Sequence, residues 1–189
     1  LIFGKRAGIA SIDYSKKLNQ QPRSTKVLDL AHENINKFIK NGRELVRPLQ
    51  YELRQIMWEN CGVIKSKDLL NSGLEKIGII RTKLSDVDVR IDKYNCEDLA
   101  LIFDLQSSLI SAEATILSAL ERNESRGAHQ RSDFHDTDPS CEFNCLIEMN
   151  LTSQKLKVSK TPLKKLTNPL QNLVNGESRE VNFKNKLLE

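Results

Sequence analysis

The chain has 189 residues, a net charge of +4 and 39% hydrophobic residues, below the about 45–50% of a typical globular domain. No run of eighteen apolar residues occurs, and charged residues interrupt the first twenty positions, which is not the pattern of a membrane span or a signal peptide. Acidic and basic residues alternate along the sequence, so its charge pattern does not predict nucleic-acid binding. The composition predicts one domain of about 100–150 residues with polar extensions.

Four cysteines are present, and no two of them form a CxxC pair. The sequence therefore predicts reduced thiols in a cytoplasmic protein rather than a disulfide framework. Four residues of metal-binding types lie within seventeen positions and raise the hypothesis of a zinc site: His129, His135, Cys141 and Cys145. A strand with both thiols on its core face is the simpler explanation of the last two. We expect no metal and no activated thiol, although spatially adjacent Cys and His residues stay a formal alternative.

The chain begins at Leu1 within an apolar stretch that continues into Gly4, Ala7 and Gly8. Because a natural N-terminus seldom starts inside an element, this opening predicts the C-terminal piece of a longer protein. Residues 1–20 are expected to form a helix that Pro22 stops. A second, mostly polar helix over residues 24–41 would complete an N-terminal helical arm.

The centre of the sequence has the strongest helical periodicity. Pro48 suits the first turn of a helix that ends before Gly62, and Ser66 is a candidate N-cap for a second helix that reaches Ile91. A third helix is expected over residues 97–125, where apolar residues recur at steps of three and four. Such helices can bury their apolar stripes only against each other, so the sequence predicts an antiparallel three-helix bundle that is spectrin-repeat-like.

Beyond these helices the hydrophobic period changes from helix to strand. Alternate positions from Cys141 to Met149 are apolar and predict a half-buried strand, and Leu156 and Val158 predict its partner across a short turn. The expected fold class is therefore mainly α, with a small C-terminal β-hairpin. After Pro162 the sequence is rich in Lys, Asn and Leu, and we expect an extended tail there.

The most informative polar segment is the run RNESRGAHQRSDF, from Arg122 to Phe134. It lies on a connection between elements, where polar side chains usually bind other segments. Residue chemistry alone favours a plain helix terminus in which Arg126 satisfies backbone carbonyls and Glu124 pairs with a neighbouring arginine. The alternative is a domain-docking surface, for which the candidates are Glu124, Ser125, Arg126, His129, Arg131 and Asp133.

This run resembles the ESRGAHxRxDF signature of the flavoprotein subunits of succinate dehydrogenase and fumarate reductase, and of the related L-aspartate oxidases. Phe3 to Gly8 resembles the FGRxAG helix that closes the FAD-binding domain of that family, and Leu53 to Ile64 resembles the segment that opens its C-terminal helical domain. The resemblance covers residues 48–160 well. Departures include Lys65, where the family often has Arg, and His135, where it frequently has Pro.

The resemblance implies a three-helix bundle followed by a hairpin, in agreement with the periodicity. It also implies that the full-length protein is an FAD-dependent oxidoreductase that interconverts succinate and fumarate, whereas this part carries no catalytic and no cofactor-binding residue. The implied partners are its own flavin-binding domain and, in a dehydrogenase, an iron-sulfur subunit that accepts the electrons. Such a protein would be cytoplasmic and would lie on the membrane face through its partners, without inserting.

The resemblance also divides the chain. Residues 1–47 are expected to end the FAD-binding domain and form linker helices, 48–127 to form the bundle, 128–160 the connecting segment and hairpin, and 161–189 the tail. Two alternatives stay open at this point. One is an L-aspartate oxidase of NAD biosynthesis, which oxidises L-aspartate to iminoaspartate. The other is a stand-alone helical module for protein interaction.

Overall fold

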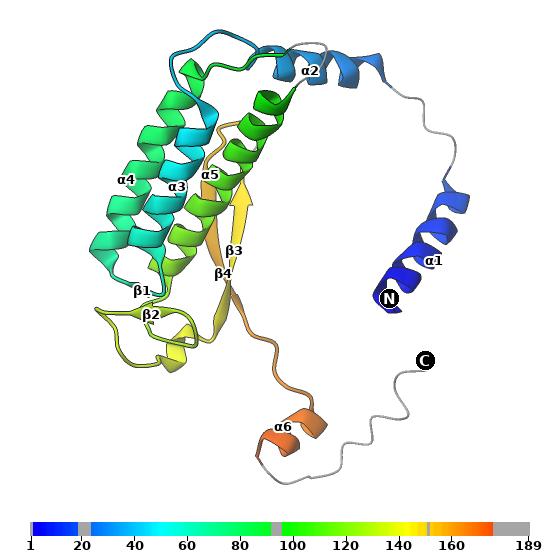
Figure 1. Ribbon diagram of the computed structural model, residues 1–189. Coiled ribbons are helices and arrows are strands. Elements are labelled where there is room, and N and C mark those ends of the chain that lie inside the picture. Colours follow the sequence, from blue (N-terminus) through cyan, green and yellow to red (C-terminus); the bar gives the residue numbers. More distant parts are fainter. Residues whose placement is uncertain (1, 19–23, 92–95, 151, 176–189) are drawn as a thin grey trace. The chain divides into compact units, whose positions relative to one another are not determined.

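The computed structural model describes residues 2–18, 24–91, 96–150 and 152–175. It is mainly helical and carries a small antiparallel strand pair, as the sequence predicts (Figure 1). Its helices and strands are, in chain order, α1 (Ile2–Lys17), α2 (Thr25–Asn36), α3 (Val46–Cys61), β1 (Ile64–Lys65), α4 (Lys67–Lys83), α5 (Glu97–Glu121), β2 (Gln130–Arg131), β3 (Phe143–Met149), β4 (Leu156–Pro162) and α6 (Asn168–Val174). The chain divides into two compact units: unit 1 is Leu1–Pro48 with Lys83–Leu105, and unit 2 is Leu49–Thr82 with Gln106–Glu189.

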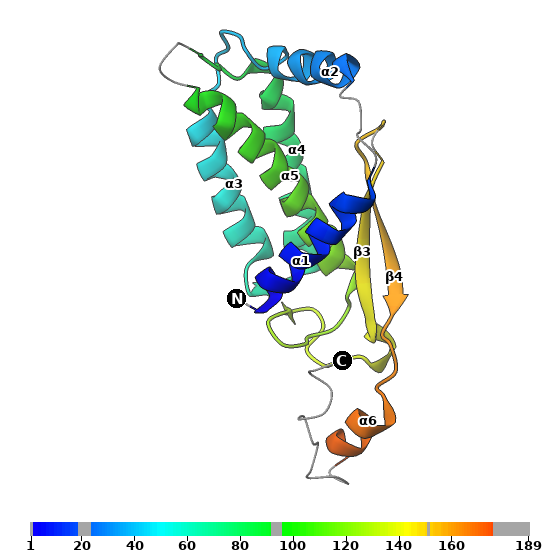
Figure 2. The same ribbon diagram turned by 90° about the vertical axis from the view of Figure 1, so that its right-hand side faces the viewer.

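Unit 2 contains most of α3, nearly all of α4 and the second half of α5, and these helices lie side by side in two perpendicular views (Figures 1 and 2). Their inward residues recur at steps of three and four, the spacing of one helix face. The buried apolar residues of this core are Leu49, Leu53, Ile56, Leu70, Ile77, Ile80, Leu109, Ala112, Ile116 and Ala119. Ile102 and Leu105, earlier in α5, are also buried, so the apolar residues predicted at steps of three and four are confirmed as one buried face from Ile102 to Ala119.

Gly73 allows the three helices of unit 2 to approach closely. A Cβ atom at this position would lie 3.0 Å from both the Asn60 Cβ and the Ile116 Cδ1. Asn60, itself buried, donates from Nδ2 to the carbonyl oxygen of Leu69 at 3.0 Å and accepts from Lys76 Nζ at 3.1 Å. The helix-weakening glycine is therefore explained by a contact that a larger residue would displace.

Two of the predicted helix ends are confirmed. The Ser66 hydroxyl accepts a hydrogen bond of 3.3 Å from the backbone N–H of Leu69, which is the N-cap arrangement for α4. Helix α3 ends at Cys61, directly before Gly62. A Cβ atom at Gly62 would lie 2.6 Å from the Trp58 carbonyl oxygen, so the chain can turn this closely only at a residue without a side chain.

The second central helix is shorter than predicted. It ends at Lys83, eight residues before Ile91, and a 3₁₀ turn follows. Val87, Asp88 and Val89 are then all buried, and the backbone N–H of Val89 donates to the Lys40 carbonyl oxygen at 2.9 Å. The apolar spacing that suggested a longer helix belongs to an extended segment that pairs with the residues before α3 within unit 1.

Three further boundaries differ from the predictions. Helix α2 ends at Asn36 instead of residue 41, and α5 ends at Glu121 instead of Ser125 because the following segment folds back. The predicted extended tail contains the short helix α6. Pro22, the expected stop of the first helix, lies outside the described residues.

The predicted hairpin is confirmed. Strands β3 and β4 pair in antiparallel register, with Phe143 opposite Pro162 and Met149 opposite Leu156. Phe143 is buried, as is Cys141 in the 3₁₀ turn that precedes β3. The hairpin therefore packs its first half into unit 2 and leaves its far end, where Met149 is 38% exposed, at the surface.

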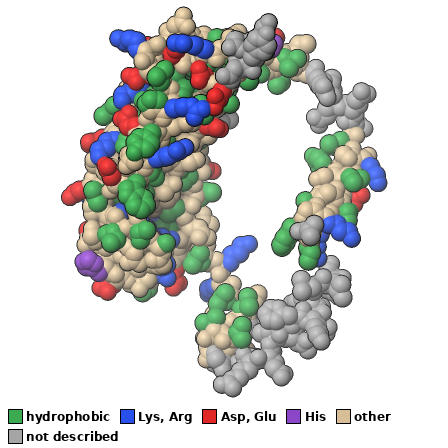
Figure 3. Space-filling model, viewed as in Figure 1, with side chains coloured by type: hydrophobic (Ala, Val, Ile, Leu, Met, Phe, Trp, Pro, Cys, Tyr) green, Lys and Arg blue, Asp and Glu red, His purple; other side chains and the backbone are tan. Residues whose placement is uncertain are grey.

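Among the described residues, α5 is the one helix that is long and apolar enough to cross a membrane by length and composition. Its residues Ile102, Leu105, Leu109 and Ile116 are at most 1% exposed, which is the pattern of a core helix. Acidic, basic and hydrophobic side chains are interspersed over the helices on the face that Figure 3 shows.

Candidate functional site

The guanidinium group of Arg131 is buried at the end of α5 and forms the centre of the candidate site. Its Nε and Nη2 atoms each donate a hydrogen bond of 2.7 Å to one carboxylate oxygen of Asp133. Its Nη1 atom donates to the carbonyl oxygens of Ala119 at 3.0 Å and Arg122 at 3.2 Å. The last carbonyls of a helix lack intrahelical partners, so Arg131 closes α5. Its hydrogen bonds hold the pKa of Asp133 well below the usual range.

Two arginines pair with the carboxylate of Glu124, which is fully buried. The carboxylate accepts hydrogen bonds from Arg126 Nε at 3.0 and 3.1 Å and from the backbone N–H of Asp138 at 2.9 Å, and it also binds Arg122 Nη1. The hydrogen bond from Arg126 outweighs the opposing effect of burial and, with the other donors, lowers the pKa of Glu124 to about 2. Glu124 is therefore ionised at neutral pH.

Ser125 and Gly127 shape the backbone between these two ion pairs. The Ser125 hydroxyl oxygen accepts a hydrogen bond of 2.8 Å from the backbone N–H of Arg131. Gly127 has a φ of 59°, and the turn it makes lets Arg126 and His129 exchange two backbone hydrogen bonds of 2.8 and 3.0 Å. A left-handed backbone favours glycine, so the geometry explains why glycine occupies this position.

A two-residue parallel pairing joins this segment to the connection between α3 and α4. Strand β1 lies beside β2, with Lys65 opposite Arg131. The backbone N–H of Ser132 donates to the Lys65 carbonyl oxygen at 2.9 Å, and the backbone N–H of Lys67 donates to Asp133 Oδ2 at 2.9 Å. The sequence could not reveal this pairing, because two residues are too few to show a period.

The structure brings the six predicted docking residues into one network, but they differ in accessibility. Glu124, Ser125 and Arg131 are buried, whereas the Arg126 side chain is 44% exposed and His129 is half-buried. The interpretation as a plain helix terminus is right in pairing Glu124 with arginines. It is wrong about the helix carbonyls, which Arg131 and His129 bind in place of Arg126.

Arg122 is a structural residue of this site that sequence reasoning missed. Its Nη1 donates to the Cys141 carbonyl oxygen at 2.9 Å, its Nη2 binds the Phe143 carbonyl oxygen, and its guanidinium carbon lies 4.9 Å from the centre of the Phe143 ring. Arg122 thus fastens the start of the hairpin to the end of α5. Its position two residues before Glu124 is the sequence signal, and the prediction of a helix that reaches Ser125 conceals it.

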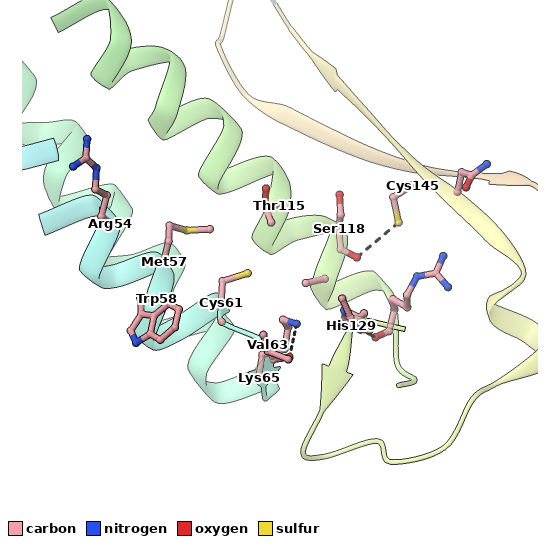
Figure 4. Close-up of a pocket in the computed structure, with 15 residues that line it drawn as sticks. Arg54, Met57, Trp58, Cys61, Val63, Lys65, Thr115, Ser118, His129 and Cys145 are labelled. Carbon is pink, nitrogen blue, oxygen red and sulfur yellow. Dashed lines mark hydrogen bonds between the residues drawn. The ribbon is translucent and has the colours of Figure 1, made fainter. Parts of the chain in front are cut away.

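A pocket of about 880 Å³ lies beside this network, entirely within unit 2 (Figure 4). Side chains from α3, α5, β1 and the segment after α5 line it, including Arg54, Met57, Trp58, Cys61, Lys65, Thr115, Ser118 and His129. Burial raises the pKa of the Cys61 thiol and lowers the pKa values of Lys65 and His129. A thiol with a raised pKa is not an activated nucleophile.

The residues of the zinc hypothesis have other neighbours. A ring nitrogen of His129 lies 3.0 Å from the carbonyl oxygen of Arg122, and Cys145 Sγ lies 3.7 Å from the carbonyl oxygen of Ser118. Within the described part of the chain, no group of three or more His, Cys, Asp and Glu side chains is placed to hold a metal ion.

Comparison with known proteins gives a family match. The sequence matches the family described as "Fumarate reductase flavoprotein C-term" over residues 50–184. It is 28% identical over 153 residues to one subunit of the fumarate reductase (CoM/CoB) of Methanothermobacter marburgensis, and 32% identical over 143 residues to the succinate dehydrogenase flavoprotein subunit of Rickettsia conorii. These alignments cover 81% and 72% of this chain, but 28% and 23% of the two relatives. The chain therefore spans less than a third of their length.

Solved structures agree at the level of the fold. The Mycobacterium smegmatis Sdh1 complex in the apo form has a TM-score of 0.77 at 23% identity, covering 89% of this chain and 30% of that one. The quinol fumarate reductase of E. coli has a TM-score of 0.75 at 22% identity, covering 88% and 29%. Since the family match spans well over half of the sequence and includes the whole segment around Arg131, this chain belongs to the fumarate reductase flavoprotein C-terminal family.

Proposed function

We propose that this chain is the C-terminal helical domain of an FAD-dependent flavoprotein of the succinate dehydrogenase and fumarate reductase type. The names of the curated relatives favour this branch over L-aspartate oxidase, and the family match favours it over a stand-alone module. The domain is not catalytic by itself. It packs on the flavin-binding domain and, in a dehydrogenase, on an iron-sulfur subunit. The complete protein is cytoplasmic and reaches the membrane face through partner subunits.

In this proposal α3, α4 and α5 form an antiparallel three-helix bundle over residues 48–127. Residues 1–47 are the end of the FAD-binding domain and its linker helices, 128–160 are the connecting segment and hairpin, and 161–189 are the tail. The burial of one stripe on each helix supports the bundle, because three amphipathic helices cover one another in this way.

The docking role is supported by a hydrogen-bond network that is buried at its centre and exposed to solvent at one side. Glu124 and Arg131 have their partners inside unit 2, so they position the segment rather than bind another domain. Arg126 and His129 lie at the edge of this network. The Arg126 guanidinium has donors in a fixed plane that can bind a carbonyl or a carboxylate of a docked domain.

The two glycines of α1 do not form a dinucleotide-binding turn. A dinucleotide site needs a glycine-rich turn between a parallel strand and a helix. In the described residues Gly4 and Gly8 lie inside helix α1 and not in a turn between a strand and a helix. We therefore place FAD in the part of the longer protein that this chain does not span, and we assign no catalytic step to the residues of this chain.

The docking role is tested in the complete flavoprotein with Arg126→Ala, and with Arg81→Ala as the matched control. Arg81 pairs with Glu113 on α5, away from the signature segment. We expect R126A to accelerate proteolysis between the domains and thermal release of FAD several-fold, with the KM for dicarboxylate unchanged. R81A should change neither. A large rise in KM with intact domain docking would instead identify Arg126 as a substrate ligand and contradict the proposal.

A further inference from the structure

A buried lysine without an acidic partner lies in the wall of the pocket beside the signature segment. Lys65 is 6% exposed, and its Nζ donates a hydrogen bond of 3.0 Å to the carbonyl oxygen of Val63. An ammonium group has three donors, and lysine is almost never this buried unless it is paired with an acid. Among the described residues, no carboxylate forms an ion pair with Lys65.

The charged side chains that line the pocket are all basic. Arg54 and Arg122 line it together with Lys65, no Asp or Glu is among the lining residues, and the polar side chains of Thr115, Ser118 and Asn144 are neutral. Arg122 is already bound to Glu124 and to two carbonyl oxygens. The cations that can receive an anion in this pocket are therefore Lys65 in the wall and the exposed Arg54 on α3.

The walls between these cations are apolar. Met57, Trp58 and Val63 line the pocket, and Trp58 is 78% exposed although it is the largest apolar side chain in the sequence. Figure 4 shows Arg54, Met57, Trp58 and Cys61 along α3, with Lys65 beyond them towards His129. The volume of about 880 Å³ is within the range of about 300–1,000 Å³ that is usual for small-molecule sites.

We propose that this pocket binds a small organic carboxylate with an apolar or aromatic body. The carboxylate pairs with Lys65 and Arg54, and the body packs on Met57 and Trp58. The carboxylate of such a ligand would be the acidic partner that Lys65 lacks, and its apolar body would cover the exposed ring of Trp58. Burial lowers the pKa of Lys65, the effect expected of an ammonium group without a countercharge. The proposal does not depend on the docking role.

Trp58 is the only tryptophan of the sequence, so its fluorescence reports directly on this pocket. The 189-residue chain is titrated with 4-phenylbutyrate and with two matched probes, the neutral 4-phenyl-1-butanol and the cationic 4-phenylbutylamine. We expect a blue shift of the emission and a Kd for the carboxylate at least about tenfold below that of the alcohol, with the amine weakest. Equal affinity for the three probes would overturn the proposal, because the apolar walls alone would then explain binding.

A pair of lysine variants separates the role of Lys65 from general surface charge. Lys65→Met keeps an unbranched side chain of nearly the same length and removes its charge, whereas Lys67→Met changes an exposed lysine that does not line the pocket. We expect K65M to weaken 4-phenylbutyrate binding at least about tenfold and K67M to leave it unchanged. Unaltered binding by a K65M variant that is folded by circular dichroism would overturn the proposal. If K65M does not fold, Arg54→Gln replaces it, with an expected several-fold loss, and undiminished affinity in R54Q would count against the site.

Discussion

Arg131 and Asp133 form two parallel hydrogen bonds of 2.7 Å, with the arginine side chain buried and the carboxylate side chain 30% exposed. The Arg131 side chain is 1% exposed, and its remaining bonds close α5. A bidentate arginine–carboxylate pair is strong and geometrically specific. This pair therefore holds the signature segment in place, and the residues at its edge are the ones that can meet another domain.

Substitution of Arg131 tests whether its guanidinium group holds the signature segment in place. Arg131→Lys keeps the charge but cannot reach Asp133 and the helix carbonyls at once, so we expect the free energy of unfolding to fall by about 3 kcal/mol. Urea unfolding followed by circular dichroism measures the loss. Arg81→Lys is the control, because the Arg81 side chain is 43% exposed in its pair with the half-buried Glu113, and exposed pairs contribute about 0–1 kcal/mol. Equal losses in the two variants would show that Arg131 has no special role.

The stability of the protein should fall in acid because of Glu124. Its pKa is lowered from 4.5 to about 2 in the folded state, so its contribution is fully present above about pH 4.5 and is lost as the pH falls towards 2. The shift corresponds to roughly 3 kcal/mol. Asp133, whose pKa is also lowered, acts in the same direction.

Urea unfolding at several pH values between 7 and 2 checks this expectation. Glu124→Gln should be less stable than the wild-type chain at pH 7 and should lose about 2–3 kcal/mol less on acidification. Glu75→Gln, at an exposed position on α4, is the control and should follow the wild-type curve. Parallel curves for the wild-type chain and E124Q would rule out the buried carboxylate as a source of the pH dependence.

Replacing either of two glycines in α4 by alanine should change the stability of the protein, and the two changes should have opposite signs. A Cβ atom at Gly73 meets Asn60 and Ile116 at 3.0 Å, so Gly73→Ala should destabilise unit 2 by about 1–3 kcal/mol. A Cβ atom at Gly78 meets nothing within 4 Å, so Gly78→Ala should stabilise the helix by about 0.5–1 kcal/mol. Thermal unfolding of both variants gives the signs, and a loss of stability in G78A would contradict the packing described for α4.

The helices and the hairpin could be predicted because their burial repeats along the sequence. In α5 the residues Ile102, Leu109 and Ile116 lie on one buried stripe, and in β3 the inward face alternates from Phe143. The end of α4 could not be predicted in this way. Val87 continues the apolar spacing of the helix, and only the pairing with residues before α3 shows that it belongs to an extended segment.

The position of the candidate site could be predicted from the sequence, but the partners of its side chains could not. The sequence pattern groups six polar residues that the structure joins, but it predicts that Arg126 binds the helix carbonyls, whereas Arg131 binds them in the structure. The burial of Lys65 beside this site could not be predicted either. It depends on the two-residue pairing of β1 with β2, which brings two distant segments together without any repeat in the sequence.

The proposed function makes this chain the C-terminal domain of a flavoprotein of the succinate dehydrogenase and fumarate reductase type. The most direct measurement is an assay of the protein encoded by the complete reading frame, with succinate, fumarate and L-aspartate each tested against an artificial electron carrier. We expect a yellow protein with bound FAD that turns over succinate or fumarate and not L-aspartate. A colourless protein, or one that oxidises only L-aspartate, would contradict it.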